Sequence, residues 1–217
     1  MLLYIINMNK RLLITIITPL LLISCWSTQR DVFNDEVAKS FIQKDISSPF
    51  FWNKDSKIQI VQFWDFQCPA CIRFEKTIWE KLLNEYALKN KIWLTYKNYP
   101  LSIHMNAPED ALAWLCAAEQ WKYKEYSKAL YALEENKKWL ENTNIERSDL
   151  AAKNWLNKAV FEKCMAEWRY VDKIKSDMAE WDRLWLQWTP SVYANWNLIN
   201  FNSEESFFKI LDQLIAN

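Results

Sequence analysis

The chain has 217 residues, and its 27 lysines and arginines balance 27 aspartates and glutamates. This balance excludes the strong positive bias that is typical of proteins that bind nucleic acid or an anionic membrane surface, and the length suits one domain, with or without a subdomain. The composition is unusual in its 14 tryptophans and its lack of glycine. Average usage of about 7% would give roughly 15 glycines.

Many of the tryptophans stand where the chain is expected to turn. Asn-Gly between two apolar runs is a strong hairpin signal because both residues need a positive φ, and tryptophan meets that requirement badly. An unusually aromatic protein is one interpretation. We favour another, in which the source bacterium decodes UGA as glycine and most or all of the 14 tryptophans are glycine in the natural protein. The turn-like positions are Gln120-Trp121-Lys122, Asn154-Trp155-Leu156, Gln187-Trp188-Thr189 and Asn195-Trp196.

Residues 1–25 predict a signal peptide of the bacterial lipoprotein type. We expect translation to start at Met8, after which two basic residues precede an apolar stretch, residues 12–23, of secretory-signal length. This stretch is too short to be a comfortable transmembrane helix. The sequence LISC, which ends at Cys25, resembles the lipobox in which the cysteine carries the lipid. An ordinary cleaved signal or an uncleaved anchor is the alternative, and each of them places the body outside the cytoplasm, where disulfides are permitted.

Residues 26–49 are expected to form a polar tether, so the folded body begins near Phe50. Residues 57–63 are rich in β-branched and apolar side chains and predict a buried strand, and residues 92–96 predict a second. Between them an apolar side chain recurs every four residues, which predicts a helix with one buried face. The apolar residues of this helix are Phe74, Ile78, Leu82 and Tyr86.

Helical periodicity dominates from residue 107 to residue 184, with breaks near 136–144 and 154–155. A hairpin follows, with strands at 191–194 and 198–201, and a last helix starts near Asn202 with Glu205 in a capping position. The order βαβ, helices, ββα predicts an α/β protein with a thioredoxin-like core interrupted by a helical subdomain. The predicted boundaries are 50–106 and 185–217 for the core and 107–184 for the helical insertion.

Cys68-Pro69-Ala70-Cys71 lies between the first strand and the helix. Its spacing alone fits half a zinc site, a redox pair or chance. A closed zinc site needs four ligands, whereas the chain has one histidine and no second CxxC. A copper site lacks the usual supporting cluster of histidine or methionine, and a purely structural disulfide would be an odd use of a strand-to-helix loop. We therefore predict a redox pair that needs no metal and no organic cofactor.

The position of the motif explains its chemistry. A thiolate is the attacking species, and the N-terminus of a helix stabilises negative charge through its unpaired N–H groups. We expect Cys68 to be the partly exposed nucleophile and Cys71, one turn along, to resolve the mixed disulfide. Pro69 costs little in the first turn, because an N–H there has no intrahelical partner.

Thr189-Pro190 is the second candidate element of the site, at the start of the strand expected beside the cysteine loop. An X–Pro bond is the type of peptide bond for which the cis form is cheap. A cis Pro190 would present the backbone of Thr189 for strand-like pairing with a substrate near Cys68. Spacing alone fits equally a trans proline that opens an edge strand.

Four ordered motifs together resemble the DsbA-like thiol-disulfide oxidoreductases of the thioredoxin superfamily. The resemblance spans about residues 50–216 and implies Cys68 as the attacking thiol, Cys71 as the resolving thiol and Pro190 as the cis proline. Members of the family commonly carry glycine where this chain has tryptophan at positions 52, 121, 188 and 196. The motifs are IVQFWDFQCPACIRFE, KNYPLSIHMNA, CAAEQWKYKEY and LQWTPSVYANWN.

The chain departs from the family pattern at Gln62. Many relatives carry there, six residues before the first cysteine, a buried glutamate that assists proton transfer. Gln62 does not ionise, so this step needs water or another group, such as Asp65. His104 either lines the groove at the site or has a surface or capping role.

The two remaining cysteines, Cys116 and Cys164, fall in the helical insertion. They form either a structural disulfide that joins two helices or a pair of buried free thiols, and we favour the disulfide. Sequence does not give the connectivity of cysteines.

The resemblance implies an enzyme that introduces disulfides into exported, cysteine-containing proteins. It would lie on the extracytoplasmic face of the membrane, facing the periplasm or the cell surface and held there by its lipid or signal anchor. A membrane partner of the DsbB or VKOR type would reoxidise it, and no nucleic-acid partner is expected. The alternatives are a reductase or isomerase that works in the opposite direction, and a non-catalytic copper-handling or chaperone lipoprotein.

Overall fold

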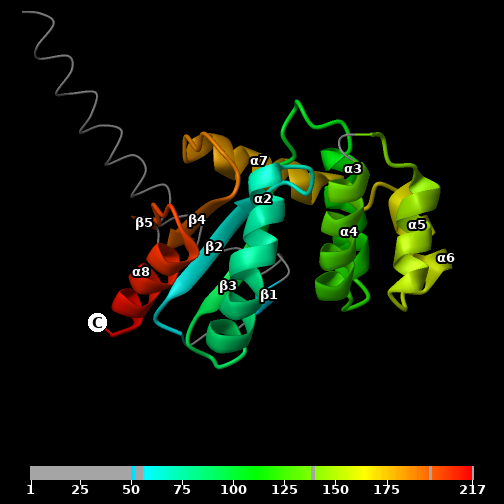
Figure 1. Ribbon diagram of the computed structural model, residues 1–217. Helices are drawn as coiled ribbons and strands as arrows, with labels where there is room; N and C mark the ends of the chain where they lie inside the picture. The colour runs from blue at the N-terminus through cyan, green and yellow to red at the C-terminus, as the bar shows by residue number, and fades with distance from the viewer. Residues whose placement is uncertain (1–49, 52–55, 138–139, 196, 217) are drawn as a thin grey trace, which may run out of the picture.

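A computed structural model describes residues 50–51, 56–137, 140–195 and 197–216 (Figure 1). The predicted signal peptide and tether, and with them Cys25, lie outside the described residues, as do Trp52 and Trp196. Among the helices within these ranges, none is both long and apolar enough to cross a membrane.

The described strands form one mixed five-stranded sheet in the order β1-β3-β2-β4-β5. The parallel pair β2 and β3 is joined by a helical crossover, and β4 runs antiparallel beside β2. This arrangement with its helical insertion confirms the predicted α/β, thioredoxin-like fold class. The strands are β1 (Phe50–Phe51), β2 (Gln59–Trp64), β3 (Trp93–Asn98), β4 (Ser191–Ala194) and β5 (Asn197–Leu198).

Alternate side chains of β2 face opposite sides of the sheet, as the pleat requires. Ile60 and Trp64 belong to the larger apolar core, which α2 (Pro69–Phe74) and α8 (Glu204–Ala216) cover. Val61 and Phe63 belong to a smaller core on the other side, where α7 (Val171–Arg183) packs (Figure 1). Gln62 therefore lies on the same side of the sheet as α2.

The helix after the cysteine motif does not keep an α-helical register throughout. It passes from α2 into two π-helical segments, η1 (Glu75–Trp79) and η2 (Leu82–Ala87). The sequence explains the change, because an apolar residue every four positions drifts around an α-helix of 3.6 residues per turn. The longer turns of a π-helix reduce this drift. All four predicted apolar residues are buried: Phe74, Ile78, Leu82 and Tyr86.

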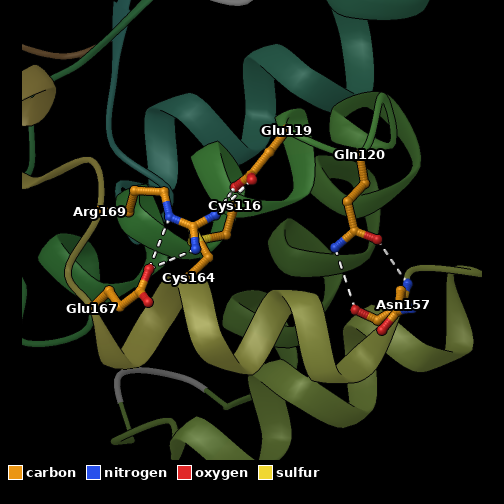
Figure 2. Close-up of a disulfide and its surroundings, with 7 residues drawn as sticks. All are labelled: Cys116, Glu119, Gln120, Asn157, Cys164, Glu167 and Arg169. Carbon is orange, nitrogen blue, oxygen red and sulfur yellow. Dashed lines mark hydrogen bonds and ion pairs between the residues drawn. A yellow bond between two sulfur atoms is a disulfide. The ribbon is translucent and has the colours of Figure 1, made fainter.

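Five helices lie between β3 and β4, and their breaks include the two that the sequence predicts. A disulfide between Cys116 and Cys164 joins α3 to α6, with a Cα–Cα distance of 5.8 Å (Figure 2). Arg169 bridges Glu119 and Glu167 beside it, with N–O distances of 2.6 Å to each. The helices are α3 (Ala107–Ala118), α4 (Tyr123–Lys137), α5 (Asn144–Lys153), α6 (Lys158–Ala166) and α7.

The C-terminal elements differ from the sequence prediction at two boundaries. The second hairpin strand is β5, at residues 197–198, so it is shorter than the predicted 198–201 and begins one residue earlier. The last helix begins at Glu204 rather than near Asn202, because the Ser203 hydroxyl accepts the backbone N–H of Ser206 and caps it. Glu205 therefore lies inside the first turn.

Four tryptophans adopt the left-handed conformation that normally selects glycine. Each follows a helix and donates its N–H three residues back, and the next N–H reaches five residues back, which is the Schellman pattern of helix termination. A side chain with a Cβ costs about 1–2 kcal/mol in this conformation. The φ values are 60° for Trp121, 65° for Trp155, 49° for Trp168 and 53° for Trp185.

We predict that Trp155→Gly raises the free energy of unfolding by about 1 kcal/mol, because glycine removes the Cβ penalty and the 88% exposed indole gives little packing in return. Urea denaturation measures the change. Trp188→Gly is the matched control, since Trp188 is also exposed and its φ is not positive. An equal gain in both variants would contradict the assignment.

Candidate redox site

The cysteine motif lies where β2 gives way to α2. Cys68 is the N-cap residue, with extended backbone angles, and its carbonyl accepts the N–H of Ile72 at 3.0 Å. Pro69 occupies the first turn, where its fixed φ suits the helix and its missing N–H costs nothing. Pro69 and Ala70 are exposed, whereas the exposed fraction is 7% for Cys68 and 1% for Cys71. Cys68 is thus less exposed than the sequence predicts, because β4 and its preceding loop cover it.

The surroundings favour the charged form of the Cys68 sulfur. A hydrogen bond from the Cys71 side chain has the largest effect, and the Thr189 side chain and the N–H groups of Cys71 and Ala70 act in the same direction. Burial opposes them. The net result lowers the pKa of Cys68 from 9.0 to about 6, so a thiolate predominates at neutral pH.

The Cys71 sulfur has the opposite preference. Burial has the largest effect on it and raises its pKa well above 9.0, and its hydrogen bond to Cys68 and the negative charge there add to the rise. Cys71 is therefore a thiol when Cys68 is a thiolate. Two neighbouring cysteines with separated pKa values can divide the roles of nucleophile and resolving thiol.

Thr189 and Pro190 reach the cysteines from the start of β4. The Thr189–Pro190 peptide bond is cis, and the Thr189 carbonyl lies 3.3 Å from the Cys68 Sγ atom and accepts its S–H in the thiol form. The Thr189 hydroxyl is buried, and it has no hydrogen-bond partner while both cysteines are neutral thiols. It is nevertheless close enough to lower the pKa of Cys68, which means that its proton is available to a thiolate.

A family model described as Thioredoxin matches residues 45–213. The chain belongs to the thioredoxin family. Two curated relatives, both named "Probable disulfide bond formation protein D", come from Bacillus anthracis and Bacillus cereus and are 25% and 24% identical over 163 residues, which is 67% of this chain and 69% of each relative. These findings support a thiol-disulfide oxidoreductase of the DsbA-like kind.

Solved structures show the same fold. BdbD from Bacillus subtilis superposes with a TM-score of 0.70 at 18% identity, over 78% of this chain and 94% of BdbD. The α-DsbA1 protein of Wolbachia pipientis gives a TM-score of 0.69 at 16% identity, over 82% of this chain and 96% of α-DsbA1.

The sequence allows two roles for His104, in the groove at the site or at the surface. The structure places His104 in the loop that faces the cysteine motif. Its Nδ1 atom lies 2.7 Å from the Asp65 carboxylate, and both residues are buried. Burial lowers the pKa of His104, but its bond to Asp65 and the negative charges of Asp65 and Cys68 raise it above 6.5 overall. The negative charge of Cys68 is thus one of the groups that favour the protonated form of His104.

Asp65 is also a structural anchor for the loop before Cys68. Its carboxylate accepts the N–H of Gln67 and the N–H of Leu101, both at 2.7 Å. Gln67 in turn accepts the N–H of Asn106 at 3.0 Å, at the entrance to the helical insertion. The bonds to Leu101 and Asn106 join residues 36 and 39 positions apart in the chain, so no local sequence pattern predicts them. They fix Cys68 relative to the insertion.

Gln62 occupies the position where many family members carry a buried glutamate. Its side chain is fully buried and neither amide atom has a hydrogen-bond partner. Cys116 and Cys164, joined to each other, lie apart from this site in the insertion. No group of three or more metal-ligating side chains comes together within the described part of the chain.

We predict that alkylation of Cys68 by iodoacetamide follows a titration with its midpoint near pH 6, and that Cys71 stays unreactive until far higher pH. Thr189→Val keeps the shape of the side chain and removes the hydroxyl proton, so the midpoint should move upward. Mass mapping of the labelled peptides at a series of pH values measures both. A Cys68 midpoint above about 8, close to a free thiol, would contradict the assigned environment.

Proposed function

We propose that Cys68 and Cys71 form the redox centre of an oxidase that introduces disulfides into exported proteins. A substrate thiolate attacks Cys68 of the Cys68–Cys71 disulfide, which forms a mixed disulfide and releases Cys71. A second substrate thiolate then attacks the substrate sulfur of the mixed disulfide. The substrate leaves with its own disulfide, and the pair keeps the two electrons as the Cys68 thiolate and the Cys71 thiol.

The single observation that carries this proposal is the placement of the two sulfurs, with Cys68 at the N-cap of α2 beside the Thr189 carbonyl and Cys71 buried behind it, which shifts their pKa values in opposite directions. Because the pKa of Cys68 is lowered to about 6, it is a good leaving group in the second step. Because the pKa of Cys71 is raised, it holds a proton and does not recapture the mixed disulfide prematurely. The Thr189 carbonyl lies beside the Cys68 sulfur, where an extended substrate would pair with the backbone of Thr189 before Pro190.

A reductase or isomerase is the second candidate, and a specific observation favours it. The value of about 6 for Cys68 lies closer to the thiol of thioredoxin, at about 7, than to that of the strong oxidant DsbA, at about 3.5. The names of the two Bacillus relatives favour disulfide formation. We therefore retain the oxidase as the conclusion.

We predict that Cys68→Ser abolishes thiol exchange with a reduced peptide, since Cys71, the other free cysteine of the site, is 1% exposed and has no partner left for a disulfide. Cys71→Ser, mixed instead with an oxidised peptide, should accumulate a mixed disulfide at Cys68, because the Cys68 thiolate attacks the peptide disulfide and no resolving thiol is left to release the peptide. Non-reducing mass spectrometry distinguishes the two outcomes. Cys116→Ser/Cys164→Ser is the control and should retain exchange. Full turnover by Cys68→Ser would refute the assigned nucleophile.

We further propose that the chain is exported and held at the membrane through a lipid on Cys25, with residues 26–49 as the tether. The LISC sequence supports the lipid, and the disulfide between Cys116 and Cys164 suits an oxidising compartment. A membrane partner of the DsbB or VKOR type would reoxidise Cys68 and Cys71. Labelled palmitate should enter the protein and be lost in Cys25→Ala; equal labelling of both would reject the lipid site.

We also propose that UGA is decoded as glycine in the source bacterium. The support is conformational, since four tryptophans stand at the C′ position of Schellman motifs, and Asn90, with a φ of 58°, fills the same position after η2. Asparagine and glycine are the residues that this position prefers. Mass spectrometry of the protein from its own cells should find glycine at positions 121, 155, 168 and 185. Tryptophan at any of these positions would reject the proposal for that codon.

A further inference from the structure

A carboxyl group lies buried one helical turn beyond the resolving cysteine. Glu75 is 8% exposed, and its Oε2 atom has no hydrogen-bond partner. The backbone N–H of Glu75 donates to the carbonyl of Cys71, which is the i to i−4 bond of an α-helix. Residues four apart in an α-helix share a face, with Cβ atoms about 5–6 Å apart. Glu75 and Cys71 are therefore neighbours on the buried face of the same helix.

A tyrosine on a different helix lies in the same apolar core as Cys71. Tyr131 of α4 is 3% exposed, and its hydroxyl has no hydrogen-bond partner. Burial has the largest effect on its pKa and raises it, and the negative charges of Cys71 and Glu75 raise it further. Tyr131 thus lies within electrostatic reach of both groups. A phenol both donates and accepts hydrogen bonds, so it is suited to pass a proton between them.

The charges around Glu75 leave it protonated at neutral pH. Burial raises its pKa to about 8, and the exposed Glu80 on the same helical stretch adds to the rise. Lys128 and Lys124 of α4 lower it without reversing it. Tyr96 of β3 is buried as well, and the negative charge of an ionised Glu75 would add to the burial that raises its pKa. A carboxylic acid that titrates near neutral pH is well matched to proton transfer.

We propose that Glu75 holds the proton that Cys71 gains and loses during the redox cycle, and that it exchanges this proton through Tyr131. The proposal rests on the redox function proposed above. It gives Glu75 the proton-transfer role that a buried glutamate has in many family members. In this chain Gln62 stands at the position of that glutamate and does not ionise.

When a substrate thiolate attacks Cys68, the bond between the two cysteine sulfurs breaks and Cys71 leaves with the electron pair. The Tyr131 hydroxyl gives its proton to the Cys71 sulfur and takes one from Glu75, so a thiolate and an acid become a thiol and a carboxylate. Glu75 recovers its proton from water. In reoxidation the same transfer runs in reverse and frees the Cys71 thiolate for attack.

Glu75→Gln keeps the size and polarity of the side chain and removes the ionisable proton. The test follows reduction of the Cys68–Cys71 disulfide by excess dithiothreitol, with the rate expressed per reductant thiolate, from about pH 6 to about pH 9. We expect the rate of the unmodified protein to fall as Glu75 ionises near pH 8. The variant should be at least about tenfold slower below that pH and should show no break there. Tyr131→Phe should behave in the same way.

Two further variants separate proton transfer from a structural role. Glu80→Gln removes an exposed carboxyl that pairs with Lys128, and it should keep the rate and the break. Gln62→Glu, added to Glu75→Gln, places a carboxyl on the α2 side of the sheet and should restore the rate. An unchanged profile in Glu75→Gln or in Tyr131→Phe would overturn the proposal, as would a slow variant that Gln62→Glu does not rescue. Exchange by the unmodified protein and its loss in Cys68→Ser test the redox function separately.

Discussion

The hydrogen bond from the Cys71 side chain to the Cys68 sulfur is the interaction on which the chemistry depends. Together with the burial of Cys71, it gives two cysteines three residues apart pKa values on opposite sides of the ordinary thiol value, about 6 for Cys68 and well above 9.0 for Cys71. At pH 7 a fall in the thiol pKa from 9.0 to about 6 stabilises the reduced pair by about 1.4 kcal/mol, which corresponds to about 30 mV for a two-electron couple. The contact is lost in the disulfide, so it acts on the reduced state alone.

The rest of the fold keeps that contact in place. β2 delivers Cys68 to the start of α2, and β4 brings Thr189 against it from the other direction. The preceding loop is fixed by Asp65 and Gln67, whose partners lie in the segment that leads into the helical insertion. The segment that enters the insertion thus supports the redox loop.

The insertion is itself held together by polar and covalent links. Arg147 of α5 pairs with Asp110 of α3 at 2.7 Å in a buried position, and the disulfide joins α3 to α6. Such links suit a protein with many polar side chains in the interior, because a buried charge is costly unless it is paired. Pro69 and Ala70, outside these links, are exposed.

Local sequence patterns predicted most of the elements and the cysteine motif, because strand composition, helical periodicity and CxxC spacing are short-range signals. The cis Pro190 came from the family resemblance, since spacing alone did not separate cis from trans. The pairing of Asp65 with His104 was not predicted, because it joins loops 39 residues apart. Glu75 was missed for a related reason: its sequence context reads as an ordinary helix, and only packing against α4 reveals that it is buried.

The pH dependence of the redox potential tests the central claim most directly. Each proton taken up with two electrons contributes about 30 mV per pH unit. Below pH 6 reduction takes up two protons, so we expect a slope of about 59 mV per unit. Above pH 6 Cys68 stays ionised and one proton is taken up, so we expect about 30 mV per unit. At pH 7 the potential should lie above the value of about −270 mV for thioredoxin, toward the value of about −120 mV for DsbA. A single slope of about 59 mV up to pH 8, with a potential at or below that of thioredoxin, would contradict both the stabilised Cys68 thiolate and the oxidase.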